Sequence, residues 1–301
     1  MLREGDRIAV VAPASPFDRS LFDQGITELR SLGLDPVFDE AVFERNHYLA
    51  GSAADRAQAF ESAWEDPRIA GLIAVRGGYG SAQLLPLLDR DTLRRRPKVV
   101  LGSSDLTSLL NFVTLHCGVV GFHGPMVTTM AGGLAGYDKR TLIGHLMQAY
   151  PYGDVMLDRV DVLKGGHARG PLFGGTLTQL VSSLGTSFPF EPPPGCVLLL
   201  DDVGERPYRI DRMLTQLQQA GVLARASAVL CTEFPDCDEP GGIVTARSIL
   251  PSLLAEIDGP VLFGVPTGHT VYPMVTLPLG VEVTVSTTPK ARVIVEEAAV
   301  I

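Results

Sequence analysis

The chain has 301 residues, 46% of them hydrophobic and 20% charged, and its formal net charge is −9. This composition predicts a globular protein with a substantial core and with room for two domains. It argues against a nucleic-acid partner, because phosphate-backbone binding needs clustered Lys and Arg, and the one basic run, Arg94–Arg96, is best explained as a solvated loop.

The N-terminus, "MLREGDRIAVVAPAS", has the order of basic, apolar and small residues that a secretory signal has. Glu4 and Asp6 interrupt its basic region, however, and only "IAVVA" is continuously apolar, which is too short for a signal. We therefore expect a buried first strand and a cytoplasmic protein. No apolar run approaches the ~18 residues of a membrane span, so no membrane partner is expected.

Short apolar segments alternate with helical patterns through the first half of the chain. Strands are predicted within 7–15, 70–80, 98–105 and 118–126, and helices within 18–33, within 81–89 and directly after 105. Strands that are apolar throughout and separated by helices imply a parallel sheet covered on both faces. Sites in such folds form at the carboxyl ends of the strands, where the loops "APASP", "RGGYG" and "GSSD" are expected.

The second half has a different character. Helices are predicted within 174–185 and 208–221, strands within 196–202, 226–234 and 259–269, and a hairpin within 275–297 around Ser286–Lys290. The periodicity fades between 150 and 170, where Pro, Gly and charged residues interrupt it. The fold class expected is α/β, with a doubly wound, mostly parallel N-terminal domain at 1–150. A linker at 151–169 and a smaller C-terminal α/β domain with a β-rich end at 170–301 complete the prediction.

Two adjacent serines, Ser103 and Ser104, stand where the third strand turns into a helix. In such a turn a serine is forced outward, and the first N–H groups of the helix face whatever that serine attacks. The simpler interpretation is an N-cap, because Ser and Asp are favoured there and Leu106, Leu109 and Leu110 form the buried face of the helix. The segment by itself favours the cap.

Other loops carry candidate residues with equally weak individual signals. The "RGGYG" turn suits close backbone approach to a ligand, but it lacks the third glycine of a dinucleotide motif, so a plain tight turn is the alternative. His123 and His269 lie at strand ends beside glycines. Asp201 and Glu205 follow an apolar strand, where acids either cap in solvent or orient a catalytic histidine. The four cysteines have no metal-binding spacing.

Taken together, seven segments in order resemble the LD-carboxypeptidase family. They are "VAPASP", "RGGYGSAQLLPLLD", "LGSSDLTSLL", "FHGPM", "GPLFGGTLTQL", "LLLDDVGERPYRIDRMLTQL" and "GVPTGHTVYPMVTLPLG". The resemblance covers nearly the whole chain. It implies a two-domain serine peptidase of cell-wall peptide recycling, dimeric, cytoplasmic and without metal or cofactor. Such an enzyme removes the terminal D-alanine of a murein tetrapeptide.

The resemblance also implies roles for particular residues. Ser104 becomes the nucleophile, His269 the general base and Asp201 the acid that orients the base. The backbone amides of Gly78 and Asp105 become the oxyanion hole. The site would then be divided, with the nucleophile and oxyanion hole on the first domain and the base and acid on the second.

Three positions depart from the family pattern. Ser103 stands in place of an aromatic residue, Thr176 in place of an Asn after paired glycines, and Asp201 in place of a Glu that is one methylene longer. Glu205 is the alternative acid. Two other functions stay open beside the carboxypeptidase: an immunity-type peptidase that cleaves a peptide–nucleotide antibiotic, and a catalytically weak peptide-binding homologue.

Overall fold

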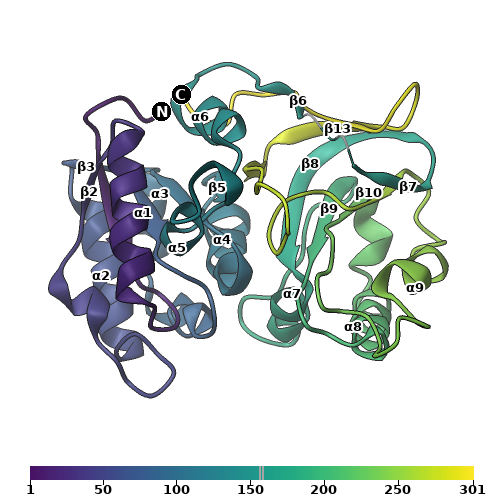
Figure 1. Cartoon of the computed structure of the whole chain (residues 1–301), viewed down its shortest axis with the longest axis horizontal. Coiled ribbons are helices and arrows are strands. Elements are labelled where there is room, and N and C mark those ends of the chain that lie inside the picture. Colours follow the sequence, from purple (N-terminus) through teal and green to yellow (C-terminus); the bar gives the residue numbers. More distant parts are fainter. Residues whose placement is uncertain (156, 158) are drawn as a thin grey trace. The chain divides into compact units, whose positions relative to one another are not determined.

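The computed structural model describes residues 1–155, 157 and 159–301 (Figure 1). The chain folds into two compact units. Unit 1 holds Met1–Ala149, Tyr272–Leu279 and Ala299–Ile301, and unit 2 holds Tyr150–Val271 and Gly280–Ala298. The chain therefore passes from unit 1 to unit 2 and returns twice.

Unit 1 is built on a six-stranded sheet. In spatial order its strands are β12 (Leu277–Leu279), β5 (Gly121–His123), β4 (Val99–Gly102), β3 (Ile69–Ala74), β1 (Arg7–Val11) and β2 (Asp35–Val37). The strands β1 to β5 run parallel, and β12 is antiparallel to β5. The strand order 2-1-3-4-5 is that of a doubly wound fold, so the predicted fold class is confirmed.

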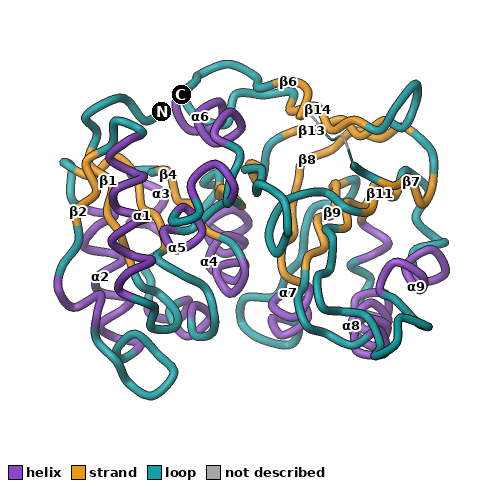
Figure 2. Tube along the Cα trace, in the orientation of Figure 1, coloured by secondary structure: helices purple, strands orange, loops and turns teal. Residues whose placement is uncertain are grey.

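Helices cover this sheet (Figure 2). They are α1 (Arg19–Ser31), α2 (Ala53–Glu65), α3 (Arg90–Arg95), α4 (Thr107–Asn111), α5 (Val127–Met130) and α6 (Lys139–Met147). The helix α1 contacts α5, whereas α2 contacts α3. Right-handed crossovers from β1 to β2 and from β2 to β3 run in opposite directions along the sheet, so they put α1 and α2 on opposite faces.

The helix α1 forms for reasons that are visible in its sequence. Asp18 caps it by accepting a hydrogen bond from the Leu21 N–H at 3.0 Å. Phe22, Ile26 and Leu29, spaced by four and three residues, form its buried face. The predicted helix at 81–89 is wrong: two short 3₁₀ turns, Ser81–Gln83 and Leu85–Leu87, stand there, because Pro86 has no N–H to continue a helix.

Unit 2 is built on an eight-stranded sheet. Its strands, in spatial order, are β6 (Gly153–Val155), β14 (Arg292–Val295), β13 (Glu282–Ser286), β8 (His167–Thr176), β9 (Cys196–Asp201), β10 (Ala226–Cys231), β11 (Val261–Phe263) and β7 (Asp161–Lys164). The central four, β8 to β11, are parallel, and the flanking strands are antiparallel. The described helices of this unit are α7 (Leu177–Ser183), α8 (Pro207–Gln219) and α9 (Ala246–Leu253).

Two segments differ from their prediction. The expected linker at 151–169 contains β6, β7 and the start of β8, because its backbone pairs with β14, β11 and β13; its residues 156 and 158 lie outside the described part of the chain. The expected hairpin at 275–297 is shorter and consists of β13 and β14. Its first part, β12, instead joins the edge of the unit 1 sheet.

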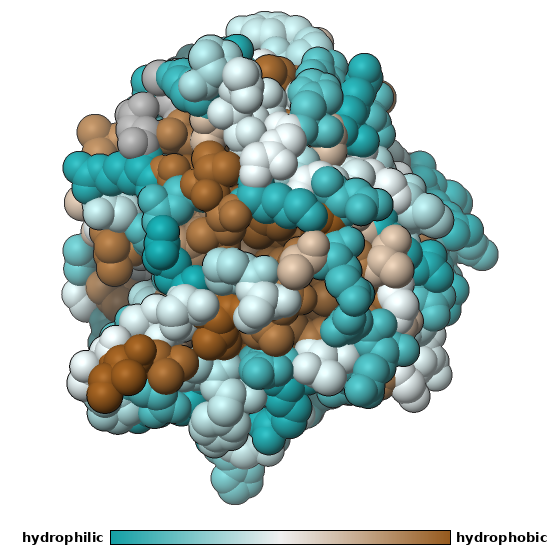
Figure 3. Space-filling view, turned by 90° about the vertical axis from the view of Figure 1, so that its right-hand side faces the viewer, coloured by the Kyte–Doolittle hydropathy of each residue, from teal (hydrophilic) through white to brown (hydrophobic). Residues whose placement is uncertain are grey.

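Some apolar side chains reach the surface of unit 2. The face in Figure 3 has apolar residues among hydrophilic ones, and the exposed residues of this unit include Val162 on the edge strand β7 and Ile243. In the part of the chain that the structure describes, no helix is both long enough and apolar enough to cross a membrane.

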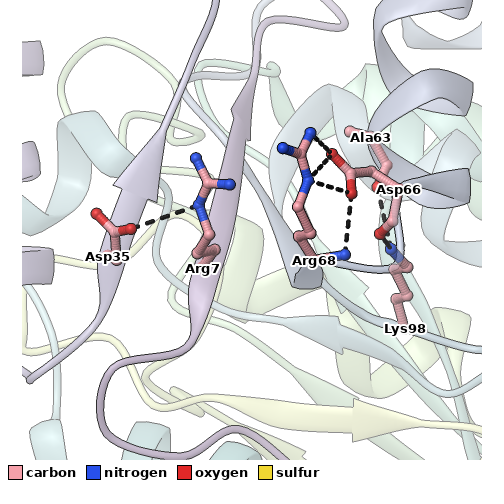
Figure 4. A network of polar contacts seen from close by, with 6 residues as sticks. All are labelled: Arg7, Asp35, Ala63, Asp66, Arg68 and Lys98. Atoms are coloured by element: carbon pink, nitrogen blue, oxygen red, sulfur yellow. Dashed lines mark hydrogen bonds and ion pairs between the residues drawn. The ribbon is translucent and has the colours of Figure 1, made fainter.

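Charged side chains gather at the amino ends of the parallel strands in unit 1, the edge opposite to the predicted site (Figure 4). Arg7, at the start of β1, lies 3.5 Å from Asp35 at the start of β2, and both are solvent-exposed. Lys98, directly before β4, donates to the carbonyl oxygens of Ala63 and Asp66 at the end of α2. These carbonyls lack helical partners, so the ammonium group caps the negative end of the helix.

We expect Lys98→Met to lower the free energy of unfolding by about 1–3 kcal/mol, because the partly buried carbonyls lose a charged donor. Urea denaturation followed by circular dichroism measures this loss. The matched control is Arg7→Met, which removes an exposed ion pair and should change stability by no more than about 0.5 kcal/mol. Equal losses in the two variants would contradict the capping role.

Candidate active site

Ser104 has a strained backbone at the carboxyl end of β4. Its φ angle is +59°, in the left-handed region that residues other than glycine rarely adopt. Ser103, just before it, is extended and occupies the N-cap position, but its side chain makes no capping hydrogen bond. The geometry is that of a sharp turn from strand to helix, which presents the side chain of Ser104 rather than that of Ser103.

The glycine loop Arg76–Gly80 follows β3, the neighbouring strand, and packs against this turn. A Cβ atom on Gly77 would lie 2.8 Å from the Ser104 Cβ and 3.0 Å from its Oγ. Gly78 has φ +105°, and a Cβ there would lie 2.4 Å from the Ser15 Oγ. Glycine is therefore required at both positions, because the backbone passes between two serine side chains.

Asp105 fastens the glycine loop to the turn. Its carboxylate is buried and accepts hydrogen bonds from the Gly80 N–H at 3.2 Å and the Ser81 N–H at 2.8 Å. The Ser81 hydroxyl donates in return to the Asp105 carbonyl oxygen at 2.5 Å. These contacts hold the backbone amides around Ser104 in one arrangement, as a preorganised site requires.

Arg56, which the sequence analysis did not single out, braces the same loops from α2. Its side chain is buried and donates to the carbonyl oxygens of Pro13 and Gly80 and to Gln83 Oε1. Burial lowers the pKa of Arg56, and the charge of Asp105 opposes that effect. No sequence signal could have identified this arginine, because it lies within an amphipathic helix whose charged residues are expected to face solvent.

In unit 2, Asp201 and His269 are joined by two hydrogen bonds. The Asp201 carboxylate is fully buried at the end of β9, and its Oδ2 lies 2.7 Å from His269 Nδ1. Its Oδ1 accepts from the backbone N–H of His269 at 3.0 Å. A Cβ on Gly268 would lie 2.5 Å from the Asp201 Cγ, so the glycine allows the loop to run against the carboxylate.

The remaining predicted residues have other partners. Glu205 Oε2 lies 3.3 Å from Arg209 Nη1, one turn along α8. His123 is buried on β5 in unit 1. Asp202 accepts from the N–H and the hydroxyl of Thr178 in the first turn of α7. Of the two acids proposed for orienting His269, the one that contacts it is Asp201.

Glu233, at the end of β10, is a second residue that the sequence analysis missed. It accepts hydrogen bonds from the Thr270 hydroxyl and, at 2.8 Å, from the Val271 N–H. It therefore holds the segment that follows His269. An acid directly after a buried strand was the available signal, but nothing in the sequence connects it with a loop 37 residues away.

Among the described residues, no three His, Cys, Asp or Glu side chains are grouped so that they could hold a metal ion. The four cysteines are free and buried. Burial raises the pKa of Cys231 and Cys237 to about 12, so these thiols are protonated and unreactive at neutral pH.

Comparison with known families gives two matches. The sequence profile of the LD-carboxypeptidase N-terminal domain matches residues 8–124, and that of the LD-carboxypeptidase C-terminal domain matches residues 169–285. The chain belongs to the LD-carboxypeptidase family. The resemblance seen in the sequence is thereby confirmed.

Individual members of the LD-carboxypeptidase family match over most of their length. The probable murein peptide carboxypeptidase of Bacillus subtilis is 31% identical over 97% of this chain and 92% of its own. The murein tetrapeptide carboxypeptidase of Pseudomonas aeruginosa is 30% identical over 87% of this chain and 88% of its own. Among solved structures, the microcin C7 self-immunity protein MccF matches with a TM-score of 0.88 at 25% identity, covering 99% of this chain and 98% of its own.

The protonation of His269 in this LD-carboxypeptidase family member follows from its neighbours. Burial, the largest single effect, lowers the pKa of His269, but the hydrogen bond and charge of Asp201, with the charge of Asp202, outweigh it and raise the pKa. A raised pKa in the folded state means that the charged pair stabilises the fold fully below the unfolded pKa of about 6.5. That contribution is lost as the pH rises through the folded pKa of His269.

We expect Asp201→Asn to bring the pKa of His269 below its ordinary value, because burial, the largest effect, remains while the charge of Asp201 is removed and only the weaker effect of Asp202 opposes it. The stability lost in this variant should be larger at pH 5 than at pH 9. NMR titration of the histidine ring and urea denaturation at the two pH values measure the two effects. Glu205→Gln is the control and should leave the titration of His269 unchanged; a shift in that variant alone would favour Glu205 as the orienting acid.

Proposed function

We propose that this protein is a serine-type LD-carboxypeptidase that removes the terminal D-alanine from murein tetrapeptides in cell-wall recycling. The observation that carries the proposal is the 2.7 Å contact between His269 Nδ1 and the buried Asp201 carboxylate. A carboxylate in that position keeps the proton on Nδ1, which leaves Nε2 as an acceptor for a serine proton. The ring remains 23% exposed, so it is accessible to a reactant.

In the proposed reaction, His269 takes the proton of Ser104 as Oγ attacks the scissile carbonyl carbon. The C–N bond then breaks, D-alanine leaves with the proton from His269, and an acyl-enzyme remains on Ser104. Water, deprotonated by His269, hydrolyses the ester and restores the serine. The nucleophile belongs to unit 1 and the base and acid to unit 2.

The proposed oxyanion hole consists of the backbone N–H groups of Gly78 and Asp105. Within the glycine loop, the N–H of Tyr79 donates to Ser15 Oγ, and those of Gly80 and Ser81 donate to Asp105. The N–H of Gly78 makes no hydrogen bond within the described chain, so it is available to a ligand. The strained turn at Ser104 supports the same assignment, since in a sharp strand-to-helix turn the N–H group of the residue after the nucleophile faces the group that is attacked.

The rest of the proposal concerns the setting of the reaction. We take the active protein to be a cytoplasmic homodimer without metal or cofactor. Its partner is a small peptide, the murein tetrapeptide. Two relatives whose names refer to murein peptides support this substrate class.

A second function is kept because of the microcin C7 self-immunity protein MccF, which matches in fold at a TM-score of 0.88 and in sequence at 26% identity for the Escherichia coli protein. This function is cleavage of a peptide–nucleotide conjugate. The murein-peptide relatives, at 31% and 30%, are somewhat more similar in sequence. They favour the carboxypeptidase.

We expect the wild-type protein to release D-alanine from murein tetrapeptide and Ser104→Ala to lower the rate by about 10³-fold or more, because the nucleophile is lost. Ser103→Ala is the matched control, one residue away, and should keep the rate within a few-fold. Mass spectrometry of the released amino acid measures the reaction.

The outcomes separate the candidate functions. Hydrolysis of an aminoacyl-nucleotide conjugate without D-alanine release would establish the immunity-type function. If Ser103→Ala, and not Ser104→Ala, abolished the reaction, the nucleophile would be misassigned. No turnover of either substrate by the wild type would leave a peptide-binding homologue.

A further inference from the structure

Two threonines flank Asp201 at the carboxyl ends of the neighbouring strands. In the parallel pair β8 and β9, Thr176 is the register partner of Asp201. Thr232 directly follows β10 on the other side, and its N–H donates to the Leu200 carbonyl oxygen at 2.9 Å. The side chains at the ends of three adjacent parallel strands therefore meet at one point.

Both hydroxyl groups donate to the Asp201 carboxylate. Thr232 Oγ1 donates to Oδ1 at 2.8 Å, and Thr176 Oγ1 donates to Oδ2 at 3.2 Å. His269 contacts the same two atoms, with its backbone N–H on Oδ1 and its Nδ1 on Oδ2. Each carboxylate oxygen thus serves one threonine and one nitrogen of His269.

This arrangement restricts the rotation of the carboxylate. The last torsion of an aspartate side chain is intrinsically broad, so burial alone does not set its angle. Threonine is stiff at χ1 because it is branched at Cβ, and both threonines are buried. One donor from each side leaves the carboxylate a single orientation in which all of these bonds form.

The close approach of β8 to β9 also helps to fix the Asp201 carboxylate. Gly174 has φ +129°, and a Cβ there would lie 2.1 Å from the Leu199 carbonyl oxygen. With a side chain at this position the strand could not lie where it does. The paired glycines 174 and 175 thus bring Thr176 within hydrogen-bond distance of Asp201.

We propose that Thr176 and Thr232 are positioning residues that hold the Asp201 carboxylate in the orientation that His269 requires. We call these two residues the threonine clamp. The catalytic consequence of the clamp rests on the proposed function, because it acts through His269. Its effect on the Asp201–His269 hydrogen bond does not depend on any substrate.

The experiment uses the full chain and removes each hydroxyl with little change in shape, as Thr176→Val, Thr232→Val and the double variant. Thr176→Ser and Thr232→Ser restore the hydroxyl. The matched control is Thr178→Val, because the Thr178 hydroxyl donates at 2.8 Å to the adjacent carboxylate, that of Asp202, and not to Asp201. Asp201 and Asp202 are the charges that raise the pKa of His269, and Glu233 is bonded to the next two residues; these variants keep all three carboxylates.

Two measurements are made on each variant. The first is the low-field proton NMR signal of His269 Nδ1–H, which reports the hydrogen bond to Asp201 without substrate and is assigned by its absence from His269→Gln. The second is the rate of D-alanine release from murein tetrapeptide, resolved into kcat and KM. Thermal denaturation identifies variants that are merely unfolded.

We expect each valine variant to move or weaken the Nδ1–H signal and to lower kcat by about 10-fold, with KM little changed. The serine variants should recover both readouts, and Thr178→Val should affect neither. The two valine changes should combine non-additively, because both act on one carboxylate.

An unchanged Nδ1–H signal in the folded double variant would overturn the clamp. So would serine variants as impaired as the valine variants, because the hydroxyl would then not be the acting group. If the wild type released no D-alanine while the signal still responded to the clamp, the proposed function would fail and the clamp would stand.

Discussion

The buried carboxylate of Asp201 is the constraint on which unit 2 depends. An ionised carboxylate away from water is costly unless donors surround it, and here they come from the ends of β8 and β10 and from the His269 loop. Three strand ends and one loop must therefore be correctly aligned for this single group to be satisfied. The glycines at 174 and 268 follow from that requirement, since each lets backbone approach where a side chain would collide.

Unit 1 also contains a buried carboxylate that is surrounded by hydrogen-bond donors, that of Asp105. Asp105 is buried, and its carboxylate accepts hydrogen bonds from the N–H groups of Gly80 and Ser81. Arg56 holds the same loop by donating to the carbonyl oxygen of Gly80. Here the carboxylate fixes backbone amides instead of a histidine. In both units a buried aspartate at the carboxyl edge of a parallel sheet holds the adjacent loops in one arrangement, and the hydrogen bonds it accepts offset the energetic cost of its burial.

The fold class and the residues that belong to recognisable motifs could be predicted from the sequence. Residues whose contacts depend on the register of paired strands could not. Apolar strands separated by helices were enough for a parallel sheet, and the family resemblance was enough to single out Asp201 and His269. Thr232 could not be recognised, because its relation to Asp201 exists only once β9 and β10 pair in their particular register. The pairing of β12 with β5, in the sheet of unit 1, could not be predicted either, since the alternating pattern of β12 fits a hairpin as well as an edge strand.

The replacement of Glu by Asp at position 201 was the one sequence feature that favoured a catalytically weak homologue. An aspartate is one methylene shorter, so it can orient a histidine only if the backbone of that histidine comes closer. In this chain Gly268 leaves no room for a Cβ beside the carboxylate, and both the ring and the backbone N–H of His269 contact Asp201. The shorter side chain therefore still contacts His269 through both carboxylate oxygens, so its length does not prevent it from orienting the ring.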